Sequence, residues 1–136
     1  NNVQREFYLT DLAALFREKR LKISAFKGTN PVEILGINNR RQLHEARKVL
    51  LKRMVEKWQR EGVDFLFPET VYIENNVTIG GDSMIGQGVV LKGRTVIGEA
   101  CRIHAGAVIE DAILDDEVTV KPYSVIEESR VRTQAI

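Results

Sequence analysis

The feature that most constrains this chain is an aliphatic residue that returns at every sixth position of its C-terminal half. The series consists of Ile73, Ile79, Ile85, Leu91, Ile97, Ile103 and Ile109. An α-helix cannot use this spacing, because each step of six residues turns it by about 600° and successive repeats would point in different directions. A meander of hairpins would instead require a period of two and Asn-Gly turns.

A second column of small or apolar residues accompanies the first, four positions after each aliphatic residue: Val77, Ser83, Val89, Thr95, Cys101 and Ala107. Hexapeptide repeats of this kind are typical of a parallel β-helix, in which three hexads form one triangular coil. Gly80, Gly86 and Gly98 directly follow aliphatic positions, where we expect a corner to need an unusual backbone angle or a close approach. After Ile109 the next aliphatic residue, Leu114, comes one position early, and one shortened corner would explain the slip. Val120 and Ile126 then resume the sixfold spacing.

Residues 1–40 indicate a mixture of helix and strand. "YLTDLAALFREKR" has apolar residues at helical spacing, with Thr10 or Asp11 placed to cap a helix. "LKISAF", residues 21–26, alternates and predicts a strand. Turn residues and a short apolar run, "EILGI", follow it.

The longest predicted helix covers residues 39 to about 61. Asn39 is placed to cap its start, and Gly62 suits the left-handed position after its end. Its apolar stripe is predicted to contain Leu43, Ala46, Leu50, Met54 and either Trp58 or Val55. A rod with one apolar face suits a connector docked between two bodies, and Pro68 excludes any longer helix.

Composition excludes several classes of protein. A net charge of +1 provides no global attraction to nucleic acid or to an anionic membrane. No apolar run approaches the about 20 residues that span a bilayer. The single cysteine, Cys101, excludes an internal disulfide and fits a reducing compartment. The start "NNVQREF", which lacks Met, and the end "VRTQAI", which falls within the repeat pattern, lead us to expect a piece of a longer protein.

The hexads resemble those of left-handed β-helix acyltransferases. Together with "NNVQREFYLTDL", "GINNRRQL" and "KPYSVIEES", they make the chain similar to the bacterial bifunctional N-acetylglucosamine-1-phosphate uridyltransferase and glucosamine-1-phosphate N-acetyltransferase family. The resemblance implies three parts: residues 1–40 end a Rossmann-like α/β nucleotidyltransferase domain, 41–61 form a linker helix, and 62–136 are the first coils of a left-handed parallel β-helix acetyltransferase domain.

The family's chemistry implies two reactions. An acetyl group passes from acetyl-CoA to glucosamine-1-phosphate, and the resulting N-acetylglucosamine-1-phosphate is joined to UTP in a Mg²⁺-dependent step. The product, UDP-N-acetylglucosamine, serves peptidoglycan and lipopolysaccharide synthesis. The resemblance further implies a cytoplasmic homotrimer, with no nucleic-acid partner and no membrane span.

One residue matches a binding residue of the family. Asn38, in "GINNR", stands where the family's asparagine holds Mg²⁺ and contacts UDP-N-acetylglucosamine. An amide oxygen is a suitable ligand for this hard cation. Without the family resemblance, however, the sequence around Asn38 also fits a turn or a helix cap.

No residue matches the family's catalytic groups, namely the phosphate-loop Gly and Lys residues and the acetyl-transfer histidine. We therefore predict no catalytic residue within this segment and expect the chain alone to be inactive. His44 and His104 are predicted to be surface residues, because a general base needs a substrate pocket within hydrogen-bond reach. Cys101 is predicted to act as a small inward hydrophobe.

Alternatives remain at this stage. A non-catalytic β-helix that serves as a trimerisation scaffold is compatible with every hexad. A zinc site would need about three converging histidines, and the chain has two. The basic helix could bind nucleic acid or a membrane, but charge-rich helix faces are usually only solvated.

Overall fold

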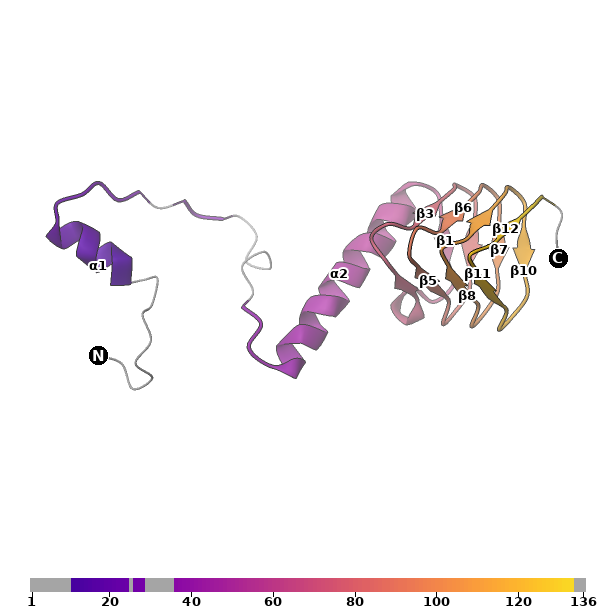
Figure 1. Ribbon diagram of the computed structural model, residues 1–136, viewed down its shortest axis with the longest axis horizontal. Helices are drawn as coiled ribbons and strands as arrows, with labels where there is room; N and C mark the ends of the chain where they lie inside the picture. The colour runs from indigo at the N-terminus through magenta and orange to yellow at the C-terminus, as the bar shows by residue number, and fades with distance from the viewer. Residues whose placement is uncertain (1–10, 25, 29–35, 134–136) are drawn as a thin grey trace. The chain divides into compact units, whose positions relative to one another are not determined.

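The computed structural model describes residues 11–24, 26–28 and 36–133 (Figure 1). It divides into two compact units, Asn1–Leu35 and Gly36–Ile136. The first unit contains α1 (Asp11–Glu18). The second contains α2 (Arg40–Arg60), β1 (Asp64–Phe65), the 3₁₀ turn η2 (Pro68–Thr70), β2 (Tyr72–Ile73), β3 (Thr78–Ile79), β4 (Met84–Ile85), β5 (Val90–Lys92), β6 (Val96–Ile97), β7 (Arg102–Ile103), β8 (Val108–Glu110), β9 (Ile113–Leu114), β10 (Thr119–Val120), β11 (Val125–Glu127) and β12 (Arg130–Val131).

The first unit contains the predicted helix but not the predicted strand. None of the residues of α1 is buried, and its apolar stripe, which includes Phe16, stays exposed. Residues 21–24 and 26 form no strand, which corrects the prediction for "LKISAF". A strand requires a hydrogen-bonded neighbour, and the described residues of this unit provide none. Most of "EILGI" lies outside the described residues, and the Rossmann-like assignment stays a prediction.

The long helix α2 begins and ends almost where the sequence predicts. The Asn39 side chain accepts a hydrogen bond from the Gln42 backbone N–H at 2.9 Å, and Gly62 adopts a φ of 88°. The predicted apolar stripe is only half right. Leu51 and Met54 pack against the core and Val55 and Trp58 are buried, whereas Leu43 and Leu50 are exposed. The helix contacts β1, β2 and η2, and its two buried residues, Val55 and Trp58, lie in its C-terminal half.

The remaining elements form a parallel β-solenoid of about four turns, as the hexads predict (Figure 1). Three sheets of four strands make three walls. Wall A has the order β1-β4-β7-β10, wall B has β2-β5-β8-β11, and wall C has β3-β6-β9-β12. The second residue of every strand is inward-facing, and the aliphatic column from Ile73 to Leu114 is buried throughout. This column is the core of the unit.

Three irregularities interrupt the coils, and the sequence predicted one of them. Val90 pairs with Val108 three hexads later, but Val108 pairs with Val125 one residue sooner, which confirms the shortened corner after Ile109. Ile113 likewise pairs with Arg130, so a second shortened corner lies beneath the first. The turn η2 adds residues to the first coil, and the hexad pattern gave no sign of it.

Glycines at the corners allow the coils to stack closely. A Cβ atom on Gly80 would lie 2.5 Å from the carbonyl carbon of Gly98, and one on Gly86 would lie 2.8 Å from the Ala105 nitrogen. Neither Gly80 nor Gly86 has a positive φ. Of the two roles expected for these glycines, close approach is therefore the one they serve.

Buried polar groups in the small-residue column are satisfied. The Ser83 hydroxyl donates to the Gly98 carbonyl at 2.9 Å and accepts from the Cys101 N–H at 3.0 Å. The Thr95 hydroxyl donates to the Lys92 carbonyl at 2.7 Å. These bonds offset the cost of placing hydroxyl groups in an apolar interior.

Candidate functional site

The turn before α2 separates two neighbouring asparagines by role. Asn39 caps the helix through its side chain. Asn38 uses its backbone N–H, which donates to the Gln42 side-chain oxygen at 2.7 Å. Its own amide side chain makes no hydrogen bond to another described residue, and Asn38 is exposed. The capping interpretation therefore belongs to Asn39, and no other described residue uses the Asn38 amide.

A magnesium ion at Asn38 would need further oxygen ligands. Within residues 11–24, 26–28 and 36–133, no group of three or more His, Cys, Asp or Glu residues is placed to hold a metal. Asn38 fits one ligand position, because a neutral amide oxygen is a donor that Mg²⁺ accepts. Water, substrate phosphates or side chains outside the described residues would have to supply the other ligands.

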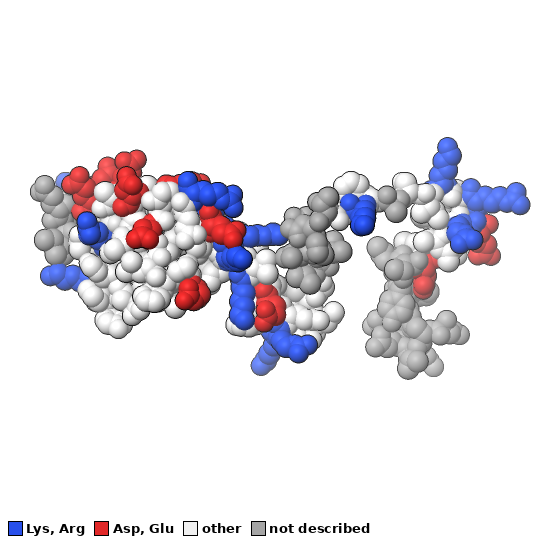
Figure 2. All heavy atoms as spheres, turned by 180° about the vertical axis from the view of Figure 1, so that it is seen from behind, with Lys and Arg blue, Asp and Glu red and all other residues white. Residues whose placement is uncertain are grey.

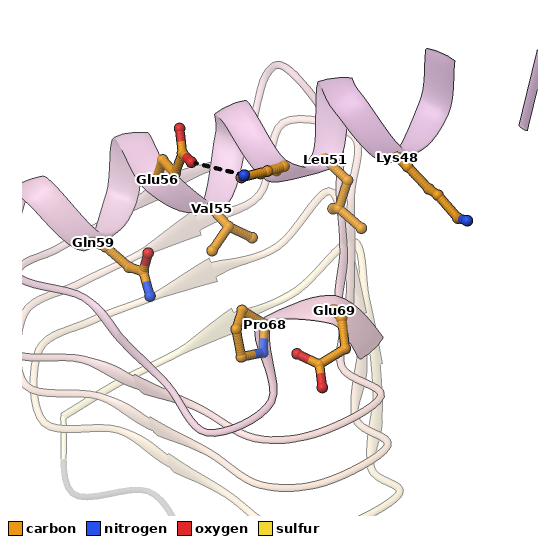
Figure 3. A pocket seen from close by; sticks show the side chains of 8 residues that line it. Lys48, Leu51, Val55, Glu56, Gln59, Pro68 and Glu69 are labelled. Atoms are coloured by element: carbon orange, nitrogen blue, oxygen red, sulfur yellow. Dashed lines mark ion pairs between the residues drawn. The ribbon is translucent and has the colours of Figure 1, made fainter. Parts of the chain in front are cut away.

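A groove lies between α2 and the 3₁₀ turn η2 (Figure 3). Its volume is about 430 Å³, and Leu51, Val55 and Pro68 give it an apolar lining. Lys52 and Glu56 pair across one helical turn at its rim, at 3.8 Å. A recess of about 670 Å³ between α2 and the first coil is lined by residues that include His44. In this recess the Tyr72 hydroxyl donates to the Glu74 carboxylate at 3.4 Å. The described linings of the two hollows contain no Ser, Thr or Cys.

The other titratable candidates behave as the sequence predicts. Cys101 is fully buried, and its thiol donates to the Asp115 carbonyl at 3.2 Å. Burial is the main cause that raises the pKa of the Cys101 thiol, so the thiol stays protonated and is a poor nucleophile. His104 lies partly exposed at a corner of the solenoid.

Charge is divided between the helix and the solenoid. Figure 2 shows lysine and arginine along the helix and acidic residues gathered over the solenoid. Some acidic side chains form hydrogen bonds between neighbouring coils, a role that the sequence analysis missed. Glu74 accepts from the Gly93 N–H at 2.9 Å, and Asp111 and Asp116 accept from backbone N–H groups one coil earlier, both at 2.8 Å. An acid directly after an aliphatic position is the signal that could have found Glu74.

No helix among the described residues is both long and apolar enough to cross a membrane. The chain has stacked hexapeptide coils, and a basic helix precedes them. It therefore belongs to the class of hexapeptide-repeat β-solenoid proteins. No family model matches the chain.

Comparison with known proteins identifies the family within this class. The chain is 46% identical over 99% of its length to the bifunctional protein GlmU of an Anaeromyxobacter species. It is 42% identical over 99% of its length to GlmU of Enterococcus faecalis, and 39% identical over 91% to GlmU of Thermus thermophilus. The predicted family resemblance is confirmed: the chain corresponds to a segment of the bifunctional GlmU proteins. It spans 27–29% of the length of these relatives.

Proposed function

We propose that this chain is the junction segment of a bifunctional enzyme that makes UDP-N-acetylglucosamine. The observation that carries the proposal is 46% identity to a bifunctional GlmU over 99% of the chain. The whole enzyme would transfer acetyl from acetyl-CoA to glucosamine-1-phosphate. It would then join N-acetylglucosamine-1-phosphate to UTP. Residues 1–40 would end the nucleotidyltransferase domain, 41–61 would link the domains, and 62–136 would begin a left-handed acetyltransferase β-helix.

Asn38 would serve the uridyltransferase reaction as a ligand of Mg²⁺ and a contact for UDP-N-acetylglucosamine. Its exposure, and an amide that makes no hydrogen bond to another described residue, support this role. When bound, magnesium would supply charge stabilisation at the phosphates. The Gln42 contact to the Asn38 N–H holds the backbone at this turn, which would orient the amide oxygen.

The assembly and location follow from the same proposal. The enzyme would be a cytoplasmic homotrimer whose β-helices pack around a threefold axis. The chain alone would be inactive, because neither the family's phosphate loop nor its acetyl-transfer histidine matches a residue here. Formation of UDP-N-acetylglucosamine by the isolated 136-residue chain would contradict this.

A chimera tests the proposal. The segment of Enterococcus faecalis GlmU that matches this chain is replaced by residues 1–136, and both reactions are assayed. We expect both activities to be retained. A folded chimera that lost both, beside an active parent, would refute the proposal.

Two variants of the chimera test the role of Asn38. Asn38→Ala should reduce uridyl transfer and weaken its dependence on Mg²⁺, while acetyl transfer is unchanged. Asn39→Ala, the matched control, should lower stability without changing the Mg²⁺ dependence. If Asn38→Ala leaves uridyl transfer intact, the ligand assignment is wrong, and a scaffold role for the segment gains support.

A further inference from the structure

The turn that precedes α2 departs from the usual capping box by one residue. In a capping box, the side chain of the cap residue accepts from the backbone N–H three positions later, and the side chain there reaches back to the backbone N–H of the cap. Asn39 and Gln42 make the first of these bonds, at 2.9 Å. The Gln42 side-chain oxygen, however, accepts from the N–H of Asn38, the residue before the cap, at 2.7 Å. The second bond of the box is therefore made to Asn38.

The stability of the helix does not account for this displaced bond. A cap must satisfy the first four N–H groups of a helix, and the Asn38 N–H lies before them. The backbone N–H of Gln42, which is one of these groups, is already satisfied by the Asn39 side chain. The bond from Asn38 to the Gln42 side chain therefore acts mainly on the position of Asn38.

The Asn38 amide depends on its backbone for its position. Asn38 is exposed, and its side chain makes no hydrogen bond to another described residue. An asparagine side chain is short and occupies a few staggered rotamers, so a fixed backbone restricts where its amide oxygen can lie. Among the described residues, the side chain that fixes this backbone through a hydrogen bond is that of Gln42, which is half-buried.

We propose that Gln42 is a positioning residue for the Mg²⁺ and UDP-N-acetylglucosamine site at Asn38. The inference rests on the proposed role of Asn38. Gln42 acts through the Asn38 backbone and not by contact with the metal or the substrate. Residues that orient a metal ligand in this way affect metal affinity although they do not bind the metal. The same Gln42 forms part of the cap of α2, so the binding site and the start of the helix share one residue.

Gln42→Leu in the chimera tests the proposal. Leucine removes the acceptor for the Asn38 N–H, keeps the backbone N–H that Asn39 caps, and favours a helix about as well as glutamine. Mn²⁺, which accepts the same oxygen ligands as Mg²⁺, is titrated in the presence of UDP-N-acetylglucosamine and followed by electron paramagnetic resonance. Gln42→Leu should weaken Mn²⁺ binding about 10-fold while the melting temperature and acetyl transfer stay unchanged. Gln59→Leu, the same change at the exposed far end of α2, is the matched control and should bind Mn²⁺ normally.

A conservative variant and Asn38→Ala complete the test. Gln42→Glu keeps an acceptor oxygen and should bind Mn²⁺ at least as tightly as the unchanged chimera. If Asn38→Ala weakens Mn²⁺ binding but Gln42→Leu does not, the positioning role is wrong and the ligand role of Asn38 stands. The positioning role is also wrong if Gln42→Glu loses binding as Gln42→Leu does, or if the loss in Gln42→Leu comes with a lower melting temperature. If Asn38→Ala itself leaves Mn²⁺ binding unchanged, the proposed ligand role and this inference fail together.

Discussion

The solenoid and helix α1 both carry apolar side chains at regular spacing, yet only the solenoid buries them. Ile85, Leu91 and Ile103 have no exposed surface, whereas Leu12, Leu15 and Phe16 of α1 are each about two-fifths exposed. This difference in burial depends on where the residues that cover each apolar face lie in the sequence. Each coil covers the one before it, so its partner is three hexads away. The apolar face of α1 has no partner among the described residues of its own unit.

The largest effect is expected from truncating the central column of the solenoid. Ile103→Ala should lower the free energy of unfolding by about 2–5 kcal/mol, because it leaves a cavity between two covered coils. Leu12→Ala in α1 is the control and should change stability by less than about 0.5 kcal/mol. Urea unfolding followed by circular dichroism measures both. Equal losses would show that α1 is packed as tightly as the coils.

A smaller effect is expected from separating two coils at a corner. Gly86→Ala places a methyl group against the backbone of Ala105 and His104, and should cost about 1–3 kcal/mol of unfolding free energy. Gly28→Ala in the first unit is the matched control, since nothing lies within 4 Å of the added atom. The stabilities of the two variants are compared by thermal unfolding. A stable Gly86→Ala protein would mean that the corners are not in close contact.

The helix that enters the solenoid offers a third comparison. Asn39→Ala removes the side chain that caps α2 and should cost about 1 kcal/mol. Asn38→Ala should leave stability nearly unchanged, because the Asn38 contact to Gln42 uses the backbone N–H. Urea midpoints of the two variants distinguish them. A larger loss of stability for Asn38→Ala than for Asn39→Ala would show that Asn38, and not Asn39, caps the helix.

The smallest effect is expected from pH and Cys101. Burial raises the pKa of the Cys101 thiol above its ordinary value of 9.0, so the folded state favours the protonated form. The stability that this provides is complete below pH 9.0 and is lost as pH rises further. Cys101→Ala should reduce the fall in stability between neutral and alkaline pH. An identical fall in both proteins would show that the thiol does not contribute.

The predictable parts of the fold are those whose partners repeat with the sequence. The hexads predicted the three-walled solenoid, because Val90, Val108 and their counterparts pair with residues about three hexads away. The caps of α2 were predictable as well, since Asn39 and Gly62 act locally. The burial of α2 was not, because whether Leu43 and Leu50 are covered depends on how far the first coil extends beneath the helix.

The candidate site was predictable to one residue only. Family resemblance pointed to Asn38, and the structure separates its amide from the capping role of Asn39. The further ligands that magnesium needs do not gather among the described residues. Residue spacing alone cannot supply them, because ligands from distant parts of a chain converge only through tertiary structure.

The shortened corner after Ile109 has a consequence for how such a coil changes over time. Once the chain loses one residue there, the corner beneath it, between Ile126 and Val131, is shortened too. The two shortened corners thus lie one above the other, and β9 and β12 stay in register. Lengthening only one of these corners by a residue would offset the strand that follows it, and a slip of one residue turns inward-facing side chains outward.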